Sequence, residues 1–356
     1  MPTEKSNLYF VYLANKLSLI NQFISFPNPS VGAVSVSNNE IVSTGITGLN
    51  GSPHAEYESI KNTKNKKVEK LYVSLIPCAH KGKNPSCTKI IKIKKIKKVI
   101  YSFDDYDVRV INHSKYDLKK NKVIISKISI SNPCFNEIKN YNYSKKNELP
   151  YITAKLAISS DYFAKNKNKK YFTNNKALKF AHLMRYKNDS ILVGKNTFED
   201  DLPLLNCRIK GIKKKNKIFL INQNLKFSKN AYKHLAKIKP YIFHSSRNND
   251  LIKKIKSYCN LIYIPCSLNK NIDTKLICKK IFELNCRKLL VEGGLKTQEL
   301  FLKNNLLNEF LIVKSNKRFN KKGMIKALKL CKNIKSKFKS EKPFRLDDNN
   351  IFRYYS

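Results

Sequence analysis

Short runs of apolar and β-branched residues alternate with helical segments, and this alternation constrains the fold more than any other feature of the chain. In the first third, Val31–Val36, Ile41–Gly45, Leu71–Ile76 and Lys98–Phe103 are such runs, and a polar turn joins the first two into a predicted hairpin. Between the second and third runs, a helix is expected with His54–Ile60 as its first turns. The order of strands and helices predicts an α/β/α layered domain.

A second α/β region follows a polar stretch. Residues 104–150 are rich in Asn, Lys and Ser, and they contain one clear strand-like piece, Lys122–Ile130. Beyond them, the predicted strands are Tyr151–Ser159, Ser190–Gly194, Lys217–Asn222, Lys288–Val291 and Glu309–Lys314, with helical segments between them. Because 356 residues exceed the usual size of one hydrophobic core, we expect two domains, residues 1–147 and 148–356.

The composition favours a cytoplasmic protein. No apolar run approaches membrane-spanning length, and the apolar stretch Leu8–Ile20 is interrupted by Asn15 and Lys16, which is typical of an amphipathic helix rather than of a secretory leader. Nine cysteines are spread without a repeating pattern, which favours a reducing compartment where thiols stay free or bind metal. The hydrophobic content of 42% is sufficient for packed cores.

The formal net charge of +46 has two interpretations. Clustered lysines release counterions from nucleic acid and would indicate a polyanion partner. Here the lysines recur along the whole chain among asparagines and isoleucines, which is what a nucleotide-composition bias of the source genome produces. In either case a basic surface attracts a phosphorylated small substrate by electrostatic steering.

One histidine, one glutamate and two cysteines form the strongest candidate for chemistry. His54 and Glu56 stand at a predicted helix start, and Cys78 and Cys87 follow the third strand. One imidazole and two thiolates are three ligands of a tetrahedral zinc ion, with water in the fourth position. Zinc lowers the pKa of that water, and a carboxylate in the position of Glu56 can carry its proton to a leaving amine. The pattern predicts a zinc-dependent deaminase.

Two other interpretations of these residues stay open. In the first, His54 caps a helix and the cysteines are small core residues. In the second, His80 replaces one of the ligands, because it follows Cys78 closely. Deaminases that act on cytidine or on nucleic acid carry Pro-Cys-x-x-Cys, whereas the interval from Cys78 to Cys87 opens a longer loop.

These motifs resemble those of the bifunctional deaminase-reductase family of riboflavin biosynthesis. In the first half, the resemblance rests on Asn28–Val34, Gly51–Glu56 and Pro77–Cys87. In the second half, it rests on Pro150–Leu156, Arg185, Asp189–Arg208 and Val291–Gly294. The blocks stand in the order of the family and cover most of the chain.

The resemblance implies a cytidine-deaminase-like three-layer domain followed by a dihydrofolate-reductase-like domain. The first would deaminate a diaminopyrimidinone ribosyl phosphate with zinc, and its glycines would let the backbone approach the substrate. The second would reduce the ribose to a ribityl chain with NADPH. The implied substrate contacts are Asn28, Lys169, Arg185, Leu205, Arg208 and Glu292. The implied cofactor contacts are Tyr171, Thr197, Asp201, Asn222, Gly293 and Gly294.

Two segments of the second domain suit a dinucleotide on physical grounds as well. Ser190–Thr197 reads as a strand leading into a glycine turn, and Glu292–Gly294 follows a buried strand and precedes a helix at Lys296–Lys303. Main-chain amides at that helix start can receive a phosphate, although a Gly-Gly pair is also typical of an ordinary turn. Arg208 adds a side chain of the type that binds phosphate as a fork.

Several positions depart from the family pattern. Thr47 stands where a further histidine is usual, and Asp104–Arg109 replaces a segment rich in proline and glycine. Tyr162 replaces a glycine, and it has neither the backbone freedom nor the small size of that residue. Lys169 and Tyr171 replace a serine and a tryptophan, which keeps an aromatic face but changes the polar contact. We therefore expect an intact zinc site and a partly altered reductase site.

Three functions follow from these observations. The first is the bifunctional enzyme, and the second is a deaminase whose degenerate reductase domain serves only assembly. The third is a nucleic-acid base deaminase or an RNA-binding protein; the long interval between the cysteines and the scarcity of any block of basic and aromatic residues argue against it. The expected partner is a small phosphorylated pyrimidine, a homo-oligomer is left open, and no membrane partner is expected.

Overall fold

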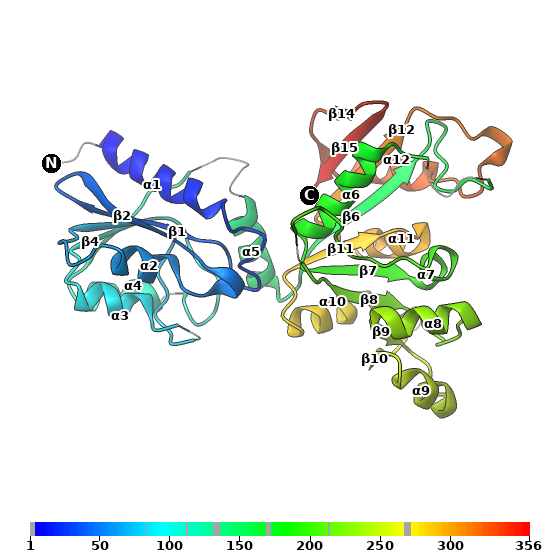
Figure 1. The fold of residues 1–356 in the computed structure, drawn as a ribbon, viewed down its shortest axis with the longest axis horizontal. Helices are drawn as coiled ribbons and strands as arrows, with labels where there is room; N and C mark the ends of the chain where they lie inside the picture. Colours follow the sequence, from blue (N-terminus) through cyan, green and yellow to red (C-terminus); the bar gives the residue numbers. More distant parts are fainter. Residues whose placement is uncertain are drawn as a thin grey trace. The chain divides into compact units, whose positions relative to one another are not determined.

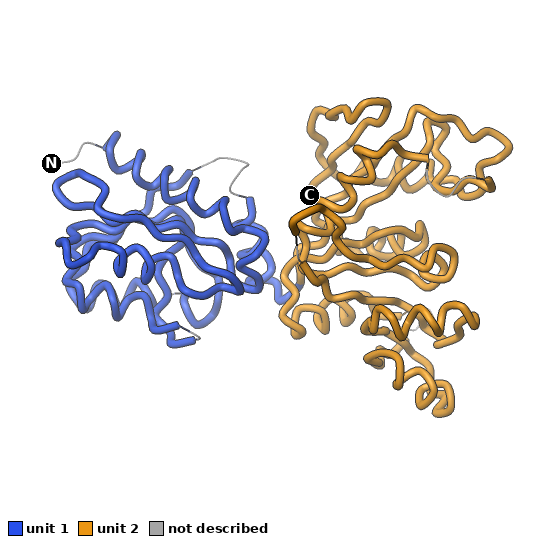
Figure 2. Tube along the Cα trace, viewed as in Figure 1, with its two compact units in different colours: residues 1–149 blue, residues 150–356 orange. Residues whose placement is uncertain are grey.

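The computed structural model describes residues 4–82, 84–111, 113–130, 136–168, 172–212, 214–266 and 272–356. The chain divides into two compact units, residues 1–149 and 150–356 (Figure 2). Each unit contains one β-sheet, and the division follows the helix Asn136–Asn147. Within the described ranges, the helices lack the length and apolar character that crossing a membrane requires.

Unit 1 is built on a five-stranded mixed sheet with the strand order β2-β1-β3-β4-β5. Its strands are β1 (Gly32–Ser37), β2 (Glu40–Ile46), β3 (Lys70–Leu75), β4 (Lys98–Phe103) and β5 (Ile124–Lys127). β1 runs antiparallel to both β2 and β3, while β3, β4 and β5 are parallel. The predicted hairpin is therefore present, and β3 is a central strand of the sheet.

Helices cover both faces of this sheet (Figure 1). They are α1 (Glu4–Ser18), α2 (Ala55–Lys61), α3 (Cys87–Ile93), α4 (His113–Lys120) and α5 (Asn136–Asn147). Successive strand residues point to opposite faces, so Val34 and Tyr72 pack with α1, whereas Ala33 and Val73 pack on the side of α2 and α3. The three-layer α/β architecture expected from the sequence is confirmed.

Unit 2 contains a ten-stranded sheet with the order β10-β9-β8-β7-β11-β6-β12-β15-β13, in which β14 pairs only with β15. The first seven strands of that order run parallel to their neighbours, and β15 is antiparallel to β12, β13 and β14. The strands are β6 (Tyr151–Ile158), β7 (Ser190–Gly194), β8 (Lys217–Ile221), β9 (Tyr241–His244), β10 (Asn260–Tyr263), β11 (Lys288–Glu292), β12 (Glu309–Ser315), β13 (Lys339–Ser340), β14 (Phe344–Leu346) and β15 (Asn349–Tyr355).

The helices of unit 2 connect the parallel strands. They are α6 (Asn175–Lys187), α7 (Lys195–Asp201), α8 (Lys229–Ile238), α9 (Asn249–Lys256), α10 (Thr274–Glu283), α11 (Leu295–Lys303) and α12 (Leu328–Lys337). Every residue of β7 and β11 is buried, which is typical of parallel strands covered on both faces. The carboxyl ends of these two strands lead directly into α7 and, after a glycine pair, into α11.

Candidate active sites

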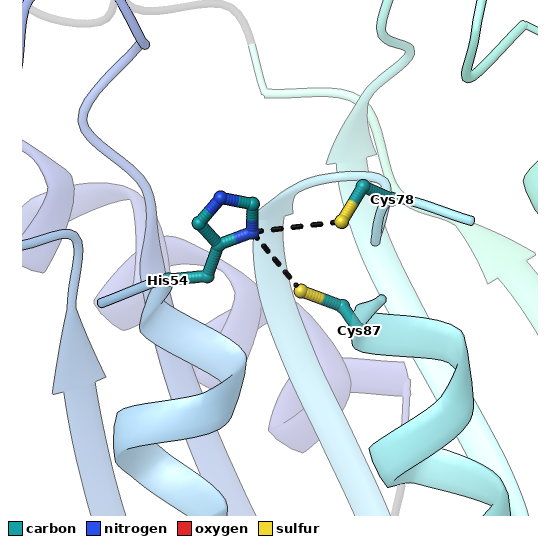
Figure 3. Close-up of side chains that lie close together, drawn as sticks. All are labelled: His54, Cys78 and Cys87. Carbon is teal, nitrogen blue, oxygen red and sulfur yellow. Dashed lines mark hydrogen bonds between the residues drawn. The ribbon is translucent and has the colours of Figure 1, made fainter. Parts of the chain in front are cut away.

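Three side chains from separate segments of unit 1 converge beside the central strand β3 (Figure 3). His54 has extended backbone and caps α2, so it lies one residue before the helix in which it was predicted. Cys78 follows the end of β3, and Cys87 is the first residue of α3. Ser86 caps that helix by accepting a hydrogen bond from the main-chain N–H of Lys89, which fixes where α3 begins.

The donor atoms of this cluster fit a tetrahedral zinc ion. Nδ1 of His54 lies 3.2 Å from Sγ of Cys87 and 3.5 Å from Sγ of Cys78, and the three atoms lie within 4.8 Å of one another. Zn–N and Zn–S bonds of ordinary length at a tetrahedral angle place an N and an S ligand about 3.6 Å apart. Within the described ranges, the group that fits a metal ion excludes His80.

The two thiols of the cluster differ in acidity, because the hydrogen bond between them lowers the pKa of Cys78 and raises that of Cys87 well above its ordinary value. A hydrogen bond from Cys87 is the largest effect that lowers the pKa of the Cys78 thiol to about 4. Metal binding requires thiolates rather than thiols. The pair therefore holds one proton fewer than two ordinary cysteines near neutral pH.

Glu56 lies in the first turn of α2 and is 4% exposed. Burial raises the pKa of its carboxyl to about 7, although the neighbouring His54 acts in the opposite direction. A carboxyl with such a pKa can both accept and release a proton near neutral pH. Glu56 thus has the position and the acidity of a proton carrier beside the cluster.

A cavity of about 190 Å³ borders this group, with Asn28, Thr47, His54, Glu56 and Cys78 in its wall. Nδ2 of Asn28 lies 3.5 Å from the carbonyl oxygen of Gly51. A Cβ on Gly51 would come within 2.4 Å of that same Nδ2. The glycine at position 51 therefore makes room for Asn28, and Gly82 is a glycine of the same motifs that lines the cavity.

Unit 2 contains a larger cavity of about 960 Å³. Among the described lining residues are eight that the sequence predicted, namely Arg185, Thr197, Asp201, Leu205, Arg208, Glu292, Gly293 and Gly294. Arg185 from α6 binds Glu292 at the end of β11 as a fork, with Nε–Oε1 and Nη2–Oε2 distances of 2.8 and 2.7 Å. Burial acts to raise the pKa of Glu292, but Arg185 holds it below its ordinary value.

The turn between β11 and α11 requires its glycines. Gly293 and Gly294 have φ of +70° and +73°, a region that other residues rarely adopt. A Cβ on Gly293 would lie 2.8 Å from Cγ2 of Thr197, and one on Gly294 would lie 2.9 Å from its Oγ1. Two predicted cofactor segments, the start of α7 and the start of α11, therefore meet at this point of the cavity.

Three further predicted residues of unit 2 are outside the set of described lining residues, one by its position and two because the structure does not describe them. Asn222 is buried, its side chain donates to the carbonyl oxygen of Lys226 at 3.1 Å, and it is absent from the described lining of the cavity. The fold directs its side chain into the turn after β8. Lys169 and Tyr171 lie outside the described residues.

Comparison with known proteins identifies the family to which the chain belongs. The model of the cytidine and deoxycytidylate deaminase zinc-binding region matches residues 5–103, and that of the RibD C-terminal domain matches residues 150–316. The riboflavin biosynthesis protein RibD of Aquifex aeolicus is 29% identical over 308 residues, which cover 85% of each chain. The chain belongs to the bifunctional deaminase-reductase family of riboflavin biosynthesis. In this family a zinc-binding deaminase domain precedes an NADPH-using reductase domain.

Further relatives agree with this assignment. RibD of Buchnera aphidicola is 27% identical, with 86% of each chain covered. A Thermotoga maritima structure described as a diaminohydroxyphosphoribosylaminopyrimidine deaminase/5-amino-6-(5-phosphoribosylamino)uracil reductase superposes with a TM-score of 0.82 at 22% identity, covering 99% of both chains. Acinetobacter baumannii RibD gives the same TM-score at 19% identity, with 99% of both chains covered. These structures show that the fold is shared.

Tyr162, one of the positions that the sequence analysis singled out in the second domain, has a left-handed backbone. Its φ is +67°, a left-handed conformation that residues other than glycine rarely adopt. Its main-chain N–H donates to the carbonyl of Ser159 and its carbonyl accepts from Ala327, and Nζ of Lys314 lies 4.2 Å from its ring centroid. These contacts offset a left-handed strain of about 1–2 kcal/mol.

Two further side chains of the reductase cavity escaped the sequence analysis. Lys155 lies in the cavity wall on β6, where burial lowers the pKa of its ammonium group. In the sequence, a lysine within a mostly apolar predicted strand was the signal that could have identified this residue. His182 precedes Arg185 by one helical turn, and its Nδ1 lies 3.3 Å from the main-chain nitrogen of Arg208.

Proposed function

We propose that this chain catalyses two successive steps on one phosphorylated pyrimidine. The unit 1 site would deaminate the ring of a diaminopyrimidinone ribosyl phosphate, and the unit 2 site would reduce its ribose to a ribityl chain. Family membership supports both steps, and the convergence of His54, Cys78 and Cys87 beside buried Glu56 is the observation that carries the first.

For deamination, we assign His54, Cys78 and Cys87 as the metal ligands. Zinc, when bound, supplies a Lewis acid that makes water nucleophilic near neutral pH. The carboxylate of Glu56 takes a proton from the attacking water and gives it to the departing amine. Asn28 in the cavity wall would hold the pyrimidine through its amide group.

The experiment that tests this step supplies zinc-loaded protein with the diaminopyrimidinone ribosyl phosphate, without NADPH, and identifies the product by mass spectrometry. The proposal predicts replacement of one amino group by oxygen. Unchanged substrate would refute the step, and nucleic-acid substrates would then be tested for the competing base-deaminase function.

For reduction, we assign the turn of Gly293 and Gly294, with Thr197 and Asp201, to the cofactor. NADPH, when bound, supplies a hydride. Leu205, Arg208 and the Arg185–Glu292 pair would orient the sugar and its phosphate, and orientation is the main contribution of the protein to hydride transfer. The roles of Lys169, Tyr171 and Asn222 remain predictions from the resemblance.

The left-handed backbone at Gly293, Gly294 and Tyr162 supports an active reductase rather than a degenerate one, because it forms the turns beside the cavity. The test supplies the deaminated compound and follows loss of NADPH absorbance together with product mass. Consumption of NADPH with a gain of two hydrogens supports the proposal. Unchanged NADPH and substrate would leave unit 2 with a role in assembly alone.

We also propose a cytoplasmic location and no nucleic-acid partner. The described cysteines form no disulfide, which is usual in a reducing compartment. Salt-resistant RNA binding with base preference would contradict the second point, because adhesion through dispersed lysines weakens steeply with salt. A homo-oligomer remains an open prediction that sedimentation can test.

A further inference from the structure

Arg109 borders the unit 1 cavity together with the zinc cluster. It ends the segment Asp104–Arg109, which follows strand β4. Its Nε donates to Oδ1 of Asp107 at 2.8 Å, and its Nη2 donates to Oδ2 at 2.6 Å. The guanidinium is thus held as a fork on a carboxylate that is only 4% exposed.

The hydrogen bonds of Asp107 are satisfied within the chain. Oδ1 also accepts the main-chain N–H of Arg109 at 3.1 Å, and Oδ2 also accepts Nζ of Lys145 at 2.7 Å. Two oxygens with about four acceptor positions therefore bind four donors. Asp107 has no acceptor position left for a substrate, and it holds the Arg109 guanidinium in place.

The guanidinium of Arg109, in contrast, still has N–H groups with which it can bind a ligand. A guanidinium has five N–H groups, and two of them bind Asp107. Within the described ranges, the other three have no hydrogen-bond partner, and the side chain is 56% exposed. Lys145 contributes a second positive charge to the same carboxylate, so the group formed by Arg109, Asp107 and Lys145 carries a net positive charge.

Helix α5 holds this segment in place. Oδ1 of Asn142 accepts the main-chain N–H of Tyr106, and its Nδ2 donates to the carbonyl oxygen of Asp104. One turn along the same helix, Lys145 binds Asp107. Both ends of the segment are therefore anchored before a ligand arrives, and such preorganisation lowers the entropic cost of binding.

We propose that Arg109 binds the phosphate group of the substrate in the deaminase cavity and makes this site selective for phosphorylated pyrimidines. The inference rests on the proposed deamination. A prepositioned arginine fork with unused donors is suited to phosphate oxygens. Asp107 and Lys145 are positioning residues, because they act through Arg109.

The test compares deamination of the phosphorylated substrate with that of its dephosphorylated form, by wild type and by Arg109→Gln. Loss of charge-assisted hydrogen bonds predicts that KM for the phosphorylated form rises about 10- to 100-fold, with kcat changed less than about twofold. The dephosphorylated form should show the same kcat/KM in both proteins. Arg109→Lys should recover part of the phosphate selectivity.

Lys61→Gln is the matched control, because it removes one exposed positive charge from unit 1 outside the described cavity lining. This variant should deaminate both substrates with the same kcat and KM as wild type. Equal changes for the two substrates in Arg109→Gln, or no change in either, would overturn the inference. Zinc content measured on each variant separates these outcomes from misfolding.

A measurement on the unmodified protein needs no variant. Inorganic phosphate should compete with the phosphorylated substrate in wild type. If added phosphate does not inhibit deamination, the inference is contradicted. If wild type deaminates neither substrate, the proposed deamination itself fails, which is a distinguishable result. Deamination of both substrates with equal efficiency refutes the phosphate contact alone.

Discussion

His54, Cys78 and Cys87 are far apart in the sequence, and each is brought to the cluster by a different local structure. A helix cap, a strand end and a helix start place their donor atoms within 4.8 Å of one another. Because zinc prefers this set of nitrogen and sulfur ligands, the residue types and their order were sufficient to predict the cluster. The burial of Glu56 could not be predicted from sequence, since it depends on the packing of α2 against the sheet.

Replacement of Cys87 by serine should lower the zinc content. A hydroxyl is a much poorer zinc ligand than a thiolate, so the stoichiometry measured by elemental analysis should fall from about one to well below one per chain. Cys266→Ser is the control, because Cys266 is an exposed thiol of unit 2. Full zinc content in Cys87→Ser would instead implicate His80 or another ligand.

Tyr162 allows a test of backbone strain at a single residue. Tyr162→Ala removes the ring and its contact with Lys314 but keeps a Cβ at positive φ, whereas Tyr162→Gly removes the strain as well. The glycine variant should therefore unfold with a free energy about 1 kcal/mol larger than the alanine variant. Urea denaturation of unit 2 measures this difference. Equal stability of the two variants would show that the turn is unstrained.

At the scale of elements, the contact between α5 and Asp104–Arg109 is the feature that sequence analysis did not provide. The segment Asn136–Asn147 is polar and lacks a strong apolar stripe, so its helix was not predicted. Its side chains nevertheless fix the loop through Asn142 and Lys145. Hydrogen bonds between distant segments have no periodic signature in a sequence.

Asp107→Asn tests this contact through its pH dependence. Arg109 and Lys145 hold the pKa of the Asp107 carboxyl well below its ordinary value, against the effect of burial. A carboxyl with a lowered folded pKa stabilises the protein above its unfolded pKa, and this stabilisation is lost as pH falls. The variant should lose about 1.5–3 kcal/mol of unfolding free energy at pH 7.

Below about pH 4, where the unfolded carboxyl takes up a proton, the difference between Asp107→Asn and wild type should shrink. Chemical denaturation across this range measures it. If the difference in unfolding free energy between the two proteins stays constant at all pH values, the charge of Asp107 does not contribute to stability.

Strands were predicted well where their two faces are buried and poorly toward both edges of the unit 2 sheet. The central strands β7 and β11 are short apolar runs, and such runs are the clearest strand signal. By contrast, β9, β10 and β15 were not predicted. β10 is partly exposed. β15 contains asparagines and an arginine, so its strand conformation depends on pairing with β12, β13 and β14.

At the scale of the whole molecule, the sequence predicted two α/β units because the alternation of strands and helices is local. The order of strands within each sheet is a long-range property and was supplied by the structure alone. The same contrast applies to the two sites. Ligand types and glycine turns were predictable, while the occupied acceptor positions of Asp107 and the pairing of Arg185 with Glu292 became known only from the structure.

One chain is proposed to contain two chemically separate active sites, and Glu56→Gln separates their activities. The measurement supplies this variant, with NADPH, first with the diaminopyrimidinone ribosyl phosphate and then with its deaminated form, and identifies products by mass spectrometry. Glutamine removes the proton carrier but leaves the metal ligands, so deamination should fall by about 10²- to 10⁴-fold while zinc content and reduction of the deaminated form stay at wild-type levels. Retained deamination, or joint loss of zinc and reduction, would contradict the account.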